Sequence, residues 1–393
     1  MPASCDCLLR NCVTNLVARV ASLASYCRHE WVSHLTGGAV VTVVRDMGKI
    51  ITVRGPIEPD ELGITLMHEH LLFDFVDTYY VEAEEEEQRN LGRGPIVLSN
   101  RGVLYRNPFA ISANLKHDSI VDAAREALAF KDIGGSSIVE QTPIGCGRDP
   151  VGLLEISTMT DLHIIASSGF YIAAGHPRGV RMLSLQELAD TIIQDLVNGM
   201  DRTQIRAGFL GDLGTTSGLL DDEVKCLRAA AIAHLHTGAA MGVHLDPSDR
   251  QAMKVIGLLT TEGVRPDRIV LEHLDEPAEV EPDYLLRIAA EGVYMEFDGW
   301  GSEFYYGPPW NVVEPRDRAR AVAVKRLIDA GHVERVLITH DIWLRQQMKT
   351  YGGDGFDCLF RYGLPTLREA GVADADIQTM LVDNPRRLLA LSL

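Results

Sequence analysis

Residues 119–393 alternate between short apolar runs and longer segments whose apolar residues recur at helical spacing. Together with an earlier run, the apolar runs predict eight buried strands: 64–67, 137–142, 163–166, 205–210, 241–244, 269–273, 293–297 and 336–341. Helical periodicity predicts helices over 119–131, 185–198, 223–237 and 319–330. Strands that alternate with helices in this way are typical of a closed (β/α)8 TIM barrel. An open doubly wound sheet is the alternative, but no G-x-G-x-x-G motif follows any of the strands.

Polar side chains interrupt these strands at their C-terminal ends. His68 and His70 stand one position apart at the end of the first strand, so alternation sends both imidazoles to one face. Other strands carry or end in one such residue each: Glu140, His244, His273 and Asp341. A closed barrel gathers the C-terminal strand ends at one mouth, where such folds do their chemistry. We therefore expect these side chains to converge there.

The residue types at this mouth suit a metal centre. Four histidines and two carboxylates are more ligands than one tetrahedral ion takes, so the sequence predicts two divalent ions. Zinc suits these ligands, and manganese, cobalt or iron would accept them too. For His68 and His70 taken alone, a polar strand end without metal is the alternative.

Composition excludes several classes of partner. The net charge of -18 opposes binding to nucleic acid or to anionic lipid, and no apolar run approaches the roughly 18 residues that a membrane span requires. Four of the seven cysteines lie in the first 27 residues, which leaves no disulfide framework for the body and favours a reducing cytoplasm. We expect a cytoplasmic protein that acts on a small molecule.

Two segments stand apart from the predicted barrel. Residues 1–46 read as a poorly ordered N-terminal extension, and Met47 as the start of a folded domain that spans residues 47–393. Between the first strand and the first helix, residues 77–117 form a long excursion that contains the run Glu84–Glu87. The charge run indicates a solvated face, and the length of the excursion favours a lid over the barrel mouth.

Several motifs together resemble the phosphotriesterase family of the amidohydrolase superfamily. The similarity runs from about Met47 to the C-terminus and includes 65–70, Gly147-Arg-Asp-Pro150, 168–171, Ile205-Arg-Ala-Gly208, His244, Glu272-His273 and Asp383-Asn-Pro385. The resemblance implies a binuclear metal centre in which His68 and His70 hold the more buried ion and His244 and His273 the more exposed one. It also implies that Asp341 binds metal and manages the proton, and that the protein pairs as a homodimer.

One position departs from the pattern of this family. Many members bridge the ions with a carboxylated lysine on strand four, where this chain has Gly211. Two close cations still require shared anionic charge. Glu140 is the predicted bridge, as in relatives similar to the phosphotriesterase homology protein. Asp212 is the alternative, although strand alternation would point it away from the metals.

The resemblance and the ligand set predict a metal-dependent hydrolase. Water activated by the two ions would attack a lactone or another carboxylic ester, and Asp341 would carry the proton. An amide or N-acyl amino acid, or a phosphotriester, is the alternative substrate, and a catalytically silent metal-binding interaction protein is the alternative of another class. The expected substrate contacts are Tyr171, Trp300 and Trp343. Lactonases of this family carry an arginine where this chain has Gly299-Trp300, which argues against an ordinary acyl-homoserine lactonase.

Overall fold

The computed structural model describes residues 45–307 and 311–393. The predicted N-terminal extension lies, up to residue 44, outside the described residues, and the domain boundary at Met47 stays a prediction. Within the described residues, no helix is long and apolar enough to cross a membrane.

Eight parallel strands form the central sheet, in the order β14-β11-β10-β9-β8-β7-β6-β3. Their bounds are β3 (Thr65–Glu69), β6 (Ser137–Glu140), β7 (His163–Ser168), β8 (Phe209–Gly214), β9 (Met241–His244), β10 (Ile269–Leu271), β11 (Tyr294–Phe297) and β14 (Val336–Ile338). The first and last strands meet, because the amide of Asp341 donates to the carbonyl oxygen of His68 at 3.1 Å. The sheet therefore closes on itself, which confirms the predicted (β/α)8 barrel.

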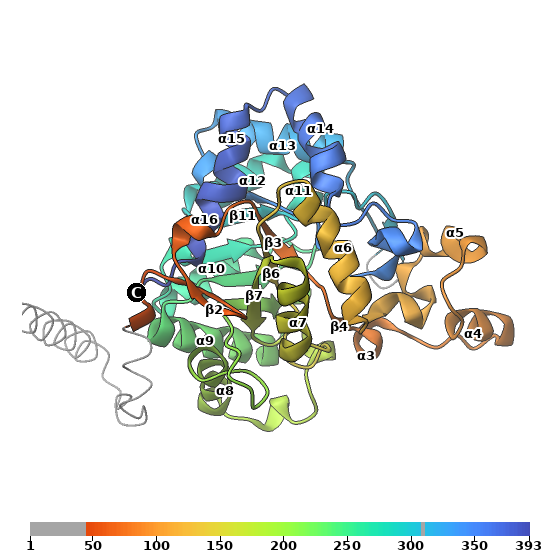
Figure 1. Cartoon of the computed structure of the whole chain (residues 1–393), viewed down its shortest axis with the longest axis horizontal. Helices are drawn as coiled ribbons and strands as arrows, with labels where there is room; N and C mark the ends of the chain where they lie inside the picture. The colour runs from red at the N-terminus through yellow and green to blue at the C-terminus, as the bar shows by residue number, and fades with distance from the viewer. Residues whose placement is uncertain (1–44, 308–310) are drawn as a thin grey trace, which may run out of the picture. The chain divides into compact units, whose positions relative to one another are not determined.

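Helices surround the strands (Figure 1). The longer ones are α6 (Ile120–Asp132), α7 (Pro150–Thr160), α8 (Leu185–Val197), α9 (Asp221–Thr237), α10 (Ala252–Thr261), α12 (Pro282–Ala290) and α13 (Asp317–Asp329). Side-chain caps start several of them: Ser119 accepts from the amide of Asp122, and Ser184 and Glu187 form a reciprocal capping box. All four predicted helices are confirmed to within two residues at either end.

Shorter elements complete the chain after the barrel strands. They are α11 (Asp275–Val280), β12 (Tyr305–Tyr306), β13 (Val312–Val313), α14 (Leu364–Glu369), α15 (Asp374–Gln378), α16 (Asn384–Leu389) and the π-helical segments η11 (Leu359–Gly363) and η12 (Thr379–Asp383). Before the first barrel strand, β1 (Ile50–Thr52) and β2 (Gly55–Ile57) form a hairpin. It contacts the barrel, since the amide of Val53 donates to the carbonyl oxygen of Ile164 at 2.8 Å.

The barrel interior is apolar toward one end and polar toward the other. One fully buried side chain from most strands joins a core cluster with residues of the hairpin and of α16: Ile50, Leu62, Met67, Val139, Ile165, Phe209, Ala240, Val270, Tyr294, Leu337, Leu388 and Leu389. The charged side chains of the same strands lie further along, at the C-terminal ends. The apolar core thus fills the N-terminal end of the barrel, and the C-terminal mouth is left for polar residues.

Two strands contain an extra residue. In β8, Leu210 pairs with Met241 and Leu213 with Val243, so a step of three residues faces a step of two on β9. In β3, the same irregularity lies between Leu66 and Glu69. Such bulges change the phase of side-chain alternation along the strand. Sequence periodicity alone therefore misplaces the side chains that follow them.

The excursion at 77–117 is held at its base by β4 (Phe73–Asp74), which pairs with β5 (Lys116–His117). Between them lie α3 (Val76–Tyr79), α4 (Glu86–Gly92), α5 (Arg101–Leu104) and several short 3-10 turns, and α4 and α5 project to one side of the barrel (Figure 1). The run Glu84–Glu87 is exposed, as expected for a solvated face. Tyr79 and Phe109 are instead buried, and they pack against Trp343 at the barrel mouth.

Candidate metal centre

The first group of potential ligands joins the two strands that close the barrel. His68 and His70 lie on and directly after β3, and Asp341 follows β14. The Oδ1 atom of Asp341 lies 3.3 Å from Nε2 of His70 and 3.6 Å from Nε2 of His68. All three side chains offer ligand atoms within 4.8 Å of one another, as a single ion requires.

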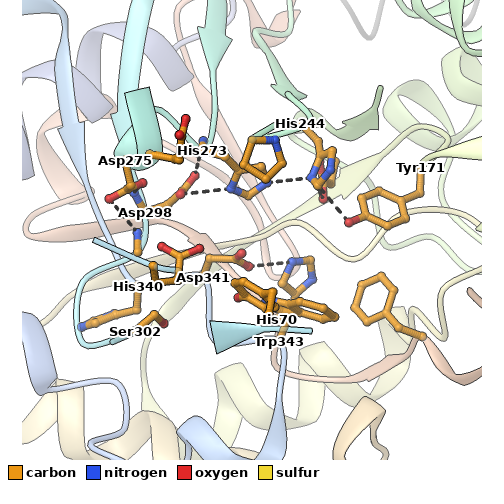
Figure 2. Close-up of a pocket in the computed structure, with 17 residues that line it drawn as sticks. His70, Tyr171, His244, His273, Asp275, Asp298, Ser302, His340, Asp341 and Trp343 are labelled. Carbon is orange, nitrogen blue, oxygen red and sulfur yellow. Dashed lines mark hydrogen bonds and ion pairs between the residues drawn. The ribbon is translucent and has the colours of Figure 1, made fainter. Parts of the chain in front are cut away.

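A second group lies beside the first. His244 ends β9, His273 follows β10 and Asp212 lies within β8. The Nε2 atom of His273 is 2.7 Å from Nδ1 of His244, which in turn is 3.9 Å from Oδ2 of Asp212 (Figure 2). Asp212 also shares a group with His68 and Glu272. Its carboxylate thus lies next to ligands of both groups.

The side chains of these groups lack the partners that buried polar atoms normally have. His68 Nε2, Asp212 Oδ1 and Asp341 Oδ1 are buried, and no hydrogen-bond partner is present for them in the described part of the chain. Among the described residues, no lysine or arginine forms an ion pair with Asp212 or Asp341. Burial raises the pKa of Asp212, although His68, His273 and His70 oppose the shift. Divalent cations would supply both the missing ligand contacts and the missing positive charge, so the donor set fits them.

Acceptors outside the centre hold the remaining ring nitrogens. The Nδ1 atom of His68 lies 3.0 Å from Oε1 of Glu296, and that of His273 lies 3.0 Å from Oδ1 of Asp298 (Figure 2). An Nδ1–H that donates outward directs the Nε2 lone pair toward the centre. Burial opposes a charged His273, but Asp298 overcomes this effect and raises the pKa of His273 to about 10. Metal binding at His273 would therefore displace a proton.

The structure places Glu140 outside every group of potential ligands among the described residues. One carboxylate oxygen accepts from the hydroxyl of Thr142 at 2.6 Å and from the amide of Leu71 at 3.2 Å. The Thr142 hydroxyl in turn lies 2.9 Å from Nδ1 of His70. Glu140 therefore positions His70 through Thr142, and its carboxylate does not reach between the two groups.

The place expected for Glu140 is taken by Asp212. The extra residue in β8 reverses the alternation that was expected to turn Asp212 away. Gly211, where many relatives have lysine, is tightly packed, because a Cβ there would lie 2.3 Å from Oε1 of Gln141. A larger residue at 211 would thus require the Gln141 side chain to move, and the carboxylate is presented at 212.

Two of the three expected substrate residues line the cavity at the centre. Tyr171 and Trp343 do so, together with Phe75 and Tyr306. Trp300 does not: it is 1 % exposed and lines a separate cavity beside Gly301 and Cys358. The loop after β11 turns the Trp300 side chain away from the centre, and contacts of Trp300 with the substrate are therefore not supported by its placement.

Sequence reasoning missed Glu296, Asp298 and Thr142. Glu296 and Asp298 stand two positions apart at the end of a buried strand, which is the same signal that identified His68 and His70. His273 and Asp341 also share a signal that only coordinates reveal, since both adopt a positive φ, 58° and 51°. Few non-glycine residues take this conformation, and five others in the described part of the chain do so away from the centre, so the signal is weak on its own.

Comparisons with known proteins agree with this geometry. The model of the phosphotriesterase family matches residues 48–389. The N-acetyltaurine hydrolase of Danio rerio is 33% identical over 344 residues, which cover 87% of this chain and 98% of that protein. Among solved structures, the resiniferatoxin-binding protein of Rhodobacter sphaeroides has 36% identity and a TM-score of 0.84, covering 87% and 95% of the two chains. The phosphotriesterase homology protein of Escherichia coli has 27% identity and a TM-score of 0.69, covering 84% and 99%. The predicted resemblance is confirmed: the chain belongs to the phosphotriesterase family and is a hydrolase.

Proposed function

We propose that the protein hydrolyses a carboxylic acyl bond of a small molecule with the help of two divalent metal ions. The observation that carries this proposal is the pair of adjoining ligand groups, with Asp212 next to both. One group would be His68, His70 and Asp341, and the other His244 and His273. Asp212 would bridge them in place of Glu140. Zinc remains our first choice of metal, with manganese, cobalt or iron as alternatives.

When bound, the two ions would acidify a water molecule and polarise the scissile carbonyl group. The side chains of the protein supply the proton transfer. Oδ1 of Asp341 faces the centre without a hydrogen-bond partner among the described residues, so it can accept the proton of the attacking water and return it to the leaving group. No serine or cysteine nucleophile is required for this reaction.

Tyr171 is placed to hold the substrate carbonyl. Its hydroxyl oxygen accepts a hydrogen bond from the hydroxyl of Tyr79 at 2.6 Å and lies 3.4 Å from Nδ1 of His244. Since this oxygen accepts from Tyr79, its own proton would be available to the substrate once Nδ1 of His244 binds an ion. Burial raises the pKa of Tyr171 well above its usual value, so the proton is present throughout the neutral range.

An amide is the first candidate for the scissile bond. The relatives named N-acetyltaurine hydrolase match nearly their whole length, and amides require a proton on the leaving nitrogen, which Asp341 can supply. A lactone or other ester, the preference of the sequence alone, is the second candidate, because the aromatic residues Phe75, Tyr306 and Trp343 line the cavity and suit an apolar acyl group. We further propose a cytoplasmic homodimer; three buried free cysteines, Cys146, Cys226 and Cys358, agree with a reducing compartment.

The test combines metal analysis with a substrate screen. Purified protein is saturated with zinc, desalted and assayed for bound metal, then incubated with N-acyl amines, N-acyl amino acids, lactones, aryl esters and a phosphotriester. We expect two ions per chain and turnover of an amide or ester that disappears with a chelator. Fewer than two ions, or two ions without turnover of any carboxylic acyl substrate, would overturn the proposal.

A further inference from the structure

We infer that the substrate carries no anionic group, so that this protein acts on uncharged acyl compounds where the related hydrolases act on N-acetyltaurine. The inference rests on the proposed acyl hydrolysis and concerns the same cavity. It follows from the charges of the side chains that line the cavity.

No lysine or arginine lines the cavity within the described residues. Its charged residues other than histidine are all acidic: Asp212, Asp275, Glu276, Asp298, Glu314 and Asp341. The proposed ions would lie at the scissile bond, where Asp212 and Asp341 share their charge, so a sulfonate or carboxylate at the other end of the substrate would meet no basic side chain of the described residues. No paired ion would then recover the desolvation cost of that group.

The arginines that contact lining carboxylates are fully engaged by them. Arg320 is completely buried and binds Asp275 at 2.6 Å, Glu314 at 2.9 Å and Asp317 at 3.0 Å. Asp275 and Asp317 already balance the charge of this guanidinium, so no positive charge remains for a ligand. Burial raises the pKa of Glu314 to about 8, so at neutral pH this carboxyl group is largely protonated and still provides no cation.

A second arginine shows the same arrangement at another side of the cavity. Arg250 lies 2.7 Å from Oε2 of Glu276 and 3.1 Å from Oε1 of Glu281. Glu276 lines the cavity, whereas Arg250 does not. The acidic partner thus stands between the arginine and any ligand.

Aromatic side chains also line the cavity. Trp343 lies at the cavity (Figure 2). Its ring is stacked with that of Tyr306, with centroids 6.1 Å apart, and meets the ring of Phe75 edge-on at 5.7 Å. These rings are buried, so they offer an apolar surface that excludes water. Such a surface binds an alkyl or aryl group and penalises a charged one.

A matched series of acetamides tests the inference. N-acetyltaurine, N-acetyl-β-alanine, N-(2-hydroxyethyl)acetamide and N-propylacetamide share the acetyl group and differ at the far end of a short chain. We expect kcat/KM of the holoenzyme for the two neutral amides to exceed that for the two anions by at least about tenfold, the effect of one unfavourable charge interaction. Equal or faster hydrolysis of the anions would overturn the inference and leave the proposed acyl hydrolysis intact.

If amides are inert and lactones are turned over, the same comparison uses γ-butyrolactone and its γ-carboxylate derivative. Inactivity on amides, esters and lactones alike would instead contradict the proposed function, and the inference with it. The two failures are therefore distinguishable.

A pair of variants tests whether charge is the cause. Pro247 lines the cavity and is partly exposed. Pro247→Lys places a cation there, and Pro247→Met supplies a side chain of similar length without charge. We expect the ratio of neutral to anionic kcat/KM to be several-fold smaller in the lysine variant than in the methionine variant. Equal ratios in the two variants would overturn the electrostatic explanation.

Discussion

At the scale of single residues, two carboxylates are placed differently from what the sequence suggested. Glu140 was expected between the ions, yet its oxygens are held by Leu71 and Thr142. Asp212 was expected to point away, yet it lies next to His68, His244 and His273. The histidines and Asp341 could be predicted because histidine and aspartate at strand ends are conspicuous. The placement of Asp212 could not be predicted, because it depends on one inserted residue in β8.

Substitution of these two carboxylates separates their roles. Asp212→Asn removes the anionic charge at the proposed bridge, so we expect it to lose one or both ions and to weaken metal binding by more than roughly 100-fold. Glu140→Gln removes only an outer contact to His70, so we expect two ions at saturating zinc and an affinity about 10–100-fold weaker. Metal titration of both variants measures the difference. If Asp212→Asn kept two ions while Glu140→Gln lost one or both, Glu140 would be the bridge, as the sequence predicted.

Glu314 predicts a pH dependence of stability. Its pKa rises from 4.5 in the unfolded chain to about 8 in the folded protein because burial disfavours the charge. The folded state therefore holds a proton that the unfolded state has released, and the stability due to this group is complete below pH 4.5 and lost as the pH rises through about 8. The slope reaches at most about 1.4 kcal/mol per pH unit.

Glu314→Gln removes this titration while keeping an acceptor for Arg320. We expect the free energy of unfolding of the variant, relative to the wild type, to improve steadily between pH 5 and pH 8. Denaturant unfolding at several pH values measures it, with the exposed Glu291→Gln as a control. A constant difference across that range would contradict the shifted pKa.

At the scale of elements, apolar periodicity predicted the eight strands and most of the longer helices. Apolar periodicity gave wrong bounds for one strand whose C-terminal half is polar. The fourth strand was expected at 205–210 and lies at Phe209–Gly214, because its metal-facing half carries Asp212 and glycines in place of an apolar run. The short helices within 77–117 were also missed, since each is too brief to show a helical period. The bounds of the fourth strand and the short helices of the excursion could thus not be predicted from periodicity.

The excursion at 77–117 is joined to the mouth mainly through aromatic packing. Phe109 stacks on Tyr79 at 5.4 Å and on Tyr306 at 6.1 Å. Phe109→Ala leaves a cavity that costs about 3–5 kcal/mol, enough to loosen this segment locally. We expect a glutamate-specific protease to cut at the exposed run Glu84–Glu87 much faster, together with a rise in KM. Leu98→Ala is the control, because this side chain of the same segment is 93% exposed, and the protease should cut this variant at the wild-type rate.

At the scale of the whole molecule, we expect metal binding and folding to be coupled. Five buried or largely buried carboxylates surround the histidines: Asp212, Glu272, Glu296, Asp298 and Asp341. Without cations their desolvation opposes folding, and burial raises the pKa of Glu272 well above its usual value. The metal-free protein should therefore be the less stable form.

Chelation should lower Tm, and zinc should restore it. A site that binds only the folded state contributes about 2.7 kcal/mol when the free metal is at 100 times its Kd. Differential scanning calorimetry with and without chelator measures the shift, and Asp212→Asn should show a smaller one. An unchanged Tm in the wild type would contradict the proposed ligand set.

The first group of ligands is split between the first and the last strand of the barrel, so it can be completed only late in synthesis. His68 and His70 come from the first strand and Asp341 follows the last, and Thr339 reaches back to His68 across 271 positions of sequence. A chain emerging from the ribosome thus has no complete chelate at this position until almost all of it has been synthesised. An ion held by His68, His70 and Asp341 would then join the two strands that meet last and stabilise the closed barrel.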